Sequence, residues 1–308
     1  MIKYEVKKGI NLFMARDNKF QDFRVCVMIH RPLTKKEVTI NSLLTAVIRM
    51  QSEHFEDSTV ISRELENLYG AELIARTGKY GENLMMKIGI QSSSDDAIGE
   101  KGNFDRVMRL LFDVAFHAGK DGAFSKQITD NEKKNITDAI LSQKNDKRSY
   151  SVLRLQEEMC KDEPYGINPM GYIDLLEEID ERTLYEHYLN VLKESRIDIF
   201  FTGNFDEENA KKAVCAYTEF LPERNDELSK SVICRDVKQV KTITDKMDVT
   251  QGKLCIGFRC PENTAVENYP AVIVYNTVFG GSATSKLFEN VREKLSLCYY
   301  VSSSIDRL

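Results

Sequence analysis

The sequence predicts an α+β fold made of two similar αβ sandwich units, each with a mainly antiparallel sheet covered by helices. Segments with strand character occur mostly as neighbouring pairs, and long helical segments are collected between them. The same order of strands and helices begins again after a polar stretch, and 308 residues can supply two hydrophobic cores. We therefore expect a first unit over 1–221, a linker over 222–237 and a second unit over 238–308. The second unit looks truncated, so we expect the native chain to continue beyond Leu308.

The elements of the first unit follow from apolar periodicity. A continuous apolar run from Val25 to Ile29 predicts a buried strand over 22–31, which Pro32 ends. Apolar side chains at helical spacing predict a helix over about 36–50. The other expected elements are a helix around 60–68 that stops at Gly70, strands over 71–77 and 82–91, helices over 103–118, 124–148, 151–160 and 181–193, a strand over 196–203, and a helix near 206–219.

The second unit is expected to repeat this order on a smaller scale. Its predicted elements are strands near 240–248 and over 251–260, helices over 267–279 and 283–295, and a strand from 297. The pair Gly280-Gly281 separates the two helices, because glycine allows the sharp change of direction between them.

Composition excludes several classes of function. With 42% hydrophobic and 30% charged residues, a net charge of −5 and no basic cluster, the chain does not suit nucleic acid. No window approaches the roughly 18 consecutive apolar residues of a membrane helix. The seven cysteines are scattered without zinc-ligand spacing. We expect reduced, mostly buried thiols in a cytoplasmic protein.

Two residues near the C-terminal end of the sequence are candidates for chemistry. Arg292 falls near the end of the predicted helix over 283–295, and Tyr299 falls at the start of the next strand. Local chemistry alone favours ordinary roles. An arginine beside Glu289 and Glu293 is usually solvated, and a strand tyrosine is usually half buried.

A family resemblance changes that balance. The stretch from Phe279 to Lys294, with Leu297-Cys298-Tyr299-Tyr300 behind it, resembles the second-half signature of the pitrilysin/insulinase metallopeptidases, which include mitochondrial processing peptidase-like proteins. The resemblance extends through Phe200–Asn204 and Leu65–Ala71 to nearly the whole chain. It implies that Arg292 and Tyr299 reach a bound peptide at the scissile bond, where two donors would stabilise a carbonyl oxygen gaining negative charge.

The metal motif of that family is missing from this chain. Active members carry H-x-x-E-H on a helix, with a downstream glutamate completing a zinc site. The motif should lie near Asn41 to Ala46, but Thr39 to Met50 contains no His, Asp or Glu. The downstream position holds Ala139, beside Asp138, which points off that face. His54 with its neighbouring acids is expected to be a surface loop residue, and the isolated His30, His117 and His187 are expected to be ordinary packing or surface residues.

The resemblance therefore implies the non-catalytic subunit of a bacterial heterodimer. It implies no cofactor in this chain, zinc in a homologous partner subunit, and a peptide substrate captured between the subunits at a sheet edge. Among bacterial pairs it points to a group associated by name with the 5-aminopentanol modification of elongation factor P. The alternative is a purely structural or peptide-binding subunit with no role in catalysis. An independent peptidase is disfavoured, because the required helix carries no two residues at ligand spacing.

Overall fold

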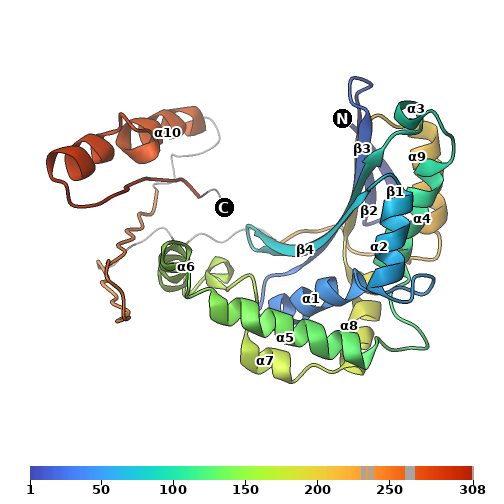
Figure 1. The fold of residues 1–308 in the computed structure, drawn as a ribbon, viewed down its shortest axis with the longest axis horizontal. Coiled ribbons are helices and arrows are strands. Elements are labelled where there is room, and N and C mark those ends of the chain that lie inside the picture. Colours follow the sequence, from blue (N-terminus) through green and yellow to red (C-terminus); the bar gives the residue numbers. More distant parts are fainter. Residues whose placement is uncertain (230–233, 235–236, 238, 261–267, 307–308) are drawn as a thin grey trace. The chain divides into compact units, whose positions relative to one another are not determined.

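The computed structural model describes residues 1–229, 234, 237, 239–260 and 268–306 (Figure 1). The chain divides into two compact units, Met1–Lys230 and Ser231–Leu308, and each is described by itself.

The first unit is built on one mixed sheet of six strands. The strands are β1 (Ile2–Lys7), β2 (Ile10–Arg16), β3 (Asp22–Pro32), β4 (Glu72–Tyr80), β5 (Asn83–Ser93) and β6 (Ile197–Gly203), in the spatial order β1-β2-β6-β3-β5-β4. Only β2 and β6 pair in parallel, and the other neighbours pair antiparallel. The central residue Val27 lies between Ile88 of β5 and Ile199 of β6. The expected α+β class with a mainly antiparallel sheet is confirmed.

Helices cover the sheet, and most of them begin at side-chain caps. They are α1 (Lys35–Ile48), α2 (Ser58–Asn67), α3 (Asp95–Ile98), α4 (Asn103–Phe116), α5 (Lys126–Ser142), α6 (Lys147–Met159), the short 3-10 helix η1 (Pro164–Gly166), α7 (Ile173–Glu177), α8 (Glu181–Glu194) and α9 (Glu207–Tyr217). Thr34 accepts from the backbone N–H of Glu37, and Asp180 caps α8 in the same way. Such caps satisfy N–H groups that have no partner inside the helix.

The core lies between the sheet and these helices. Helix α1 packs against β4 and β5, α4 against β5, and α9 against β2 (Figure 1). Leu43 and Leu44 of α1, Phe112 of α4, and Val27 and Phe201 of the sheet are fully buried. The helical spacing that predicted α1 and α4 therefore marks the faces that the core covers.

Some boundaries of the first unit differ from expectation. Strands β1 and β2 were not expected, and the helix expected over 124–148 ends at Ser142. The next helix begins at Lys147, because the Asp146 side chain accepts from the backbone N–H groups of Arg148 and Ser149.

The chain after α9 stays attached to the first unit as far as residue 229. Arg224, inside the expected linker, is buried and donates from one guanidinium nitrogen to the carbonyl oxygens of Leu192 at 2.8 Å and Ser195 at 3.2 Å. Its backbone N–H donates to Lys8. Burial lowers the pKa of Arg224 to about 10.

The second unit contains helical turns but no paired strands in its described part. Helix α10 (Tyr269–Asn276) runs into the π-helical turn η3 (Thr277–Gly281), and a second π-helical turn, η4 (Phe288–Lys294), follows. The strands expected near 240–248, over 251–260 and from 297 are not formed among the described residues, so those predictions are wrong. A strand needs a neighbouring strand for its N–H and C=O groups, and among the described residues 239–260 and 297–306 belong to no sheet.

Across the described ranges, no helix is both long and apolar enough to cross a membrane.

Candidate functional site

The second unit brings the two predicted residues, Arg292 and Tyr299, next to each other. The η4 turn carries Arg292, and Ser296 then takes a left-handed conformation with a φ of 53°. The backbone N–H of Leu297 donates to Val291 at 3.0 Å, which turns the chain back along η4. This reversal places Tyr299 beside the arginine seven residues before it.

The contact between Arg292 and Tyr299 leaves the outer guanidinium nitrogens and the phenol hydroxyl able to reach a ligand. Arg292 Nε donates to the backbone carbonyl of Tyr299 at 3.0 Å, and the guanidinium lies 4.5 Å from the ring centre of Phe288. Arg292 Nη1 is 3.8 Å from Glu293, a loose ion pair at the surface. Tyr299 is 81% exposed and the Arg292 side chain 43% exposed. The outer guanidinium nitrogens and the phenol can therefore act as two neighbouring donors.

In the first unit, α1 carries a closed polar network where the family motif would hold zinc. Asn41 Nδ2 donates to the backbone and carboxylate oxygens of Glu37, both at 2.8 Å. The Glu37 carboxylate accepts two hydrogen bonds from the guanidinium of Arg31, at 2.6 and 2.8 Å. From α8, His187 Nε2 lies 3.0 Å from Asn41 Oδ1. These side chains satisfy one another and link α1 to α8.

The network fixes the charge state of two groups. Burial lowers the pKa of His187 to about 4, although the nearby Glu37 charge acts against that shift. Burial alone would raise the pKa of Glu37, but the hydrogen bonds and charge of Arg31 outweigh it and hold the pKa below its usual value. At neutral pH His187 is therefore a neutral donor to Asn41 Oδ1, and Glu37 is ionised. His187 does pack in the interior, as expected of an ordinary histidine.

The residues on α1 do not fit zinc. Asn41 and Thr45 offer an amide and a hydroxyl, whereas zinc sites use imidazole, thiolate and carboxylate groups. On α5, Ala139 offers no ligand and Asp138 is exposed. Within the part of the chain that the structure describes, no group of three His, Cys, Asp or Glu side chains could hold a metal ion.

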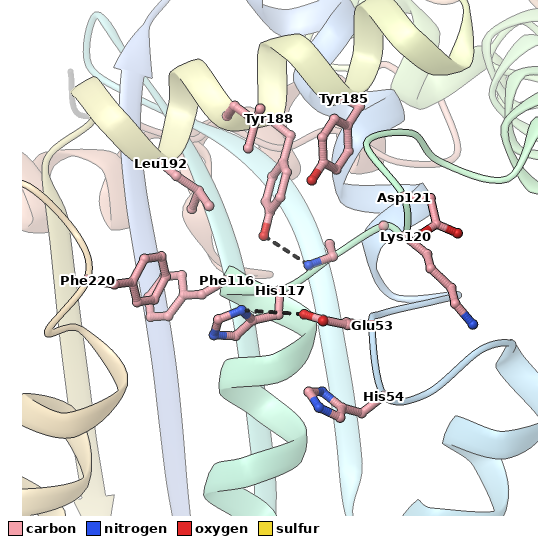
Figure 2. A pocket seen from close by; sticks show the side chains of 13 residues that line it. Glu53, His54, Phe116, His117, Lys120, Asp121, Tyr185, Tyr188, Leu192 and Phe220 are labelled. Atoms are coloured by element: carbon pink, nitrogen blue, oxygen red, sulfur yellow. Dashed lines mark hydrogen bonds and ion pairs between the residues drawn. The ribbon is translucent and has the colours of Figure 1, made fainter.

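A pocket of about 480 Å³ opens elsewhere on the first unit (Figure 2). Its walls come from α8, the end of α4, the loops 49–57 and 117–121, and Phe220 after α9. No pattern in the sequence marked this pocket, because its residues come from four separated segments.

His54 lines this pocket. It is a surface loop residue, as expected, but it also contacts a buried carboxylate. It is on a loop and half exposed, but its Nδ1 lies 2.6 Å from the buried carboxylate of Asp113 on α4. The sequence separation of 59 residues hides this pair from any local pattern.

The expectation that most of the seven cysteines are buried is wrong. Only Cys160 is buried, four are partly exposed, and Cys234 and Cys260 are exposed.

Comparisons with known proteins agree with the fold. A family model described as the peptidase M16 inactive domain matches residues 178–308. The chain is similar to the probable inactive metalloprotease YmfF of Bacillus subtilis, with 31% identity over 300 residues, covering 97% of this chain and 70% of that protein.

Solved structures show the same fold. A conserved protein from Enterococcus faecalis gives a TM-score of 0.84 at 24% identity, covering 99% of this chain and 72% of that one. The peptidase M16 inactive domain from Pseudomonas fluorescens gives a TM-score of 0.70 at 16% identity, covering 99% and 70%. The expected link to elongation factor P stays a prediction. With its M16-like fold, its inactive-domain match and its likeness to YmfF, the chain belongs to the M16 peptidase family, the pitrilysin/insulinase group.

Proposed function

We propose that this chain is the non-catalytic subunit of a two-subunit M16 peptidase and supplies Arg292 and Tyr299 to a zinc site held by a homologous partner. One observation carries the proposal. The two side chains lie together, joined at 3.0 Å through the Tyr299 carbonyl, and point their remaining donors outward, whereas α1 has no zinc ligands.

The chemistry of peptide hydrolysis suits two such donors. When water attacks the scissile carbonyl carbon, the carbonyl oxygen gains negative charge. The Tyr299 hydroxyl and the outer N–H groups of Arg292 can donate to that oxygen, which lowers the energy of the transition state. Because Nε is already bonded and the Phe288 ring lies against the guanidinium, Arg292 loses little freedom when it binds.

An open edge of the sheet supports a peptide as the substrate. Strand β4 is at one edge of the six-stranded sheet, so one side of its backbone has no strand partner within the first unit. An extended peptide can add to such an edge through main-chain hydrogen bonds. Lys79 near the end of β4 donates to the carbonyls of Tyr165 and Ile167, which supports the edge strand from one side.

The test is kinetic and uses the chain reconstituted with a zinc-bearing M16 homologue from the same genome. Tyr299→Phe removes one donor but keeps the ring, so kcat should fall about a hundredfold, or roughly 3 kcal/mol. Arg292→Lys should also reduce kcat, because an ammonium lacks the planar pair of donors. Tyr300→Phe is the matched control beside Tyr299 and should keep activity. Assembly, measured by co-purification, should be unchanged in all three variants.

The competing role is a structural or peptide-binding subunit without catalytic residues. Full activity of the pair with alanine at both 292 and 299, together with normal assembly, would establish that role and remove the proposal above.

A further inference from the structure

The pocket in Figure 2 has an apolar end formed by phenylalanine side chains and an end with charged side chains beside Tyr185. Phe116 and Phe220 lie at one end, Lys120 and Asp121 lie at the other, and Glu53, His54 and His117 lie between them. The ring of His117 lies 5.1 Å from that of Phe220. A ligand that fits this arrangement has a planar apolar body and a charged end.

The floor of the pocket is rigid and therefore preformed. The buried Tyr188 hydroxyl accepts from the backbone N–H of Ala118 at 3.0 Å and donates to the carbonyl of Ala115 at 3.3 Å. Phe124 packs against both Tyr185 and Tyr188. These contacts hold α8 against the end of α4, so binding would need little rearrangement.

The aromatic end is exposed. Phe220 is 54% exposed, and Leu189, which also lines the pocket, is exposed as well. An apolar rim next to a preformed pocket is typical of a ligand site, and the volume falls within the range of small-molecule sites.

The charged end of the pocket carries both negatively and positively charged side chains. Glu53, Asp121 and Lys120 all line the pocket. Glu53 lies 3.9 Å from His117, and Lys120 forms an exposed pair with Glu56 at 3.1 Å. Such exposed pairs are weak and can exchange partners at little cost.

His54 adds a fixed polar atom. Asp113 holds its Nδ1 at 2.6 Å, which orients the ring, and in the described part of the chain nothing accepts from or donates to its Nε2. A buried carboxylate that orients an imidazole in this way sets up the outer nitrogen for a ligand.

We propose that this pocket binds a small zwitterionic aromatic molecule of the free aromatic amino acid class. Its ring packs against the exposed ring of Phe220. Its ammonium group pairs with Glu53 or Asp121 and donates to His54 Nε2, which is the accepting nitrogen because Nδ1–H donates to Asp113. Its carboxylate pairs with Lys120. This site is separate from the peptidase role and does not depend on it.

The histidines make the binding measurable in the full chain. The protein contains four histidines, and their ring protons give separate NMR signals. His54 and His117 line the pocket, whereas His30 and His187 form buried contacts with Asp198 and Asn41. L-Phenylalanine should shift the His54 and His117 signals and leave the other two unchanged, with a dissociation constant on the order of 1 mM for a ligand of this size.

Three probes test the chemical class. Phenethylamine lacks the carboxylate, 3-phenylpropionate lacks the amine, and L-alanine lacks the ring. Each should bind about tenfold more weakly than L-phenylalanine, since each loses one of the three contacts. If either single-charge probe binds as tightly as L-phenylalanine, the zwitterion assignment is wrong.

A matched pair of variants tests the location. Phe220→Ser removes the aromatic wall and should weaken binding about tenfold. Phe20→Ser removes a phenylalanine of similar exposure, 47% against 54%, outside the pocket and should leave binding unchanged. The proposal fails if L-phenylalanine shifts no histidine up to about 20 mM, shifts all four equally, or binds Phe220→Ser as tightly as the unmodified chain.

Discussion

Asn41 lies on α1 in the stretch where the family resemblance places the zinc motif. Its side chain is bonded to Glu37 and His187. The absence of ligands on α1 could be predicted from the sequence, because the motif has fixed spacing. The hydrogen bond between Asn41 and His187 could not be predicted, since His187 lies 146 residues away and nothing local marks it as a partner.

The network predicts a pH-dependent stability. Burial lowers the pKa of His187 from 6.5 to about 4, so between these values the unfolded chain binds a proton that the folded chain refuses. The free energy of unfolding should therefore fall as the pH drops from 6.5 towards 4. Glu37 acts in the same direction, because its lowered pKa makes the folded state lose stability as that carboxylate is protonated.

Substitution of His187 by Gln isolates this effect. Glutamine can still donate to Asn41 Oδ1 but cannot take up a proton. Urea unfolding between pH 6.5 and 4.5 should show a shallower loss of stability in the variant, by at most about 1.4 kcal/mol per pH unit. Equal slopes for the two proteins would show that His187 does not titrate with unfolding.

Among the elements, periodicity predicted most helices and strands of the first unit but missed β1 and β2. The six residues of β1 alternate between apolar and charged side chains, a strand pattern that was not recognised because the segment is short. The family resemblance, not periodicity, marked Arg292 and Tyr299. In the second unit, the strand expected over 251–260 is not formed among the described residues. Alternation records which side chains could be buried, whereas a strand also needs a neighbour.

The loop after α4 provides an element-level prediction from two glycines. Gly119 has a φ of +86°, and a Cβ there would lie 2.7 Å from the Tyr185 ring. Gly122 has a φ of +77°, but a Cβ would meet nothing within 4 Å. Gly122→Ala should cost about 1 kcal/mol from backbone strain alone. Gly119→Ala should cost roughly 2 kcal/mol more, because the loop must also move off α8.

Thermal unfolding of the two variants measures this difference. Combining Gly119→Ala with Tyr185→Ala should remove most of the extra destabilisation, since the added methyl group then has room. A Gly119→Ala protein as stable as Gly122→Ala would mean that the loop does not pack on Tyr185 as described.

Over the whole molecule, the buried apolar side chains are divided unevenly between the two units. Every buried large apolar side chain of the described residues lies at or before Leu221. In the second unit, Leu254, Phe258, Val274 and Tyr299 are all exposed. A surface this apolar is typical of a protein interface, which supports the proposed partner subunit.

This division predicts that the first unit is the source of the chain's cooperative stability. A chain of residues 1–230 contains the whole sheet, its helices and the Arg224 contacts to Leu192 and Ser195, and its length is ample for an independent core. It should unfold in urea in one transition with the midpoint of the full chain. Leu43→Ala, in the centre of α1, should destabilise both chains equally, by about 3 kcal/mol.

Equal effects in both chains would show that one transition, that of the first unit, is being observed in each. The opposite result, a lower midpoint or a broad transition for residues 1–230, would mean that the second unit stabilises the first. In that case the exposed apolar side chains around Leu254 and Tyr299 would have to be covered within the chain itself, and they would no longer support a partner subunit.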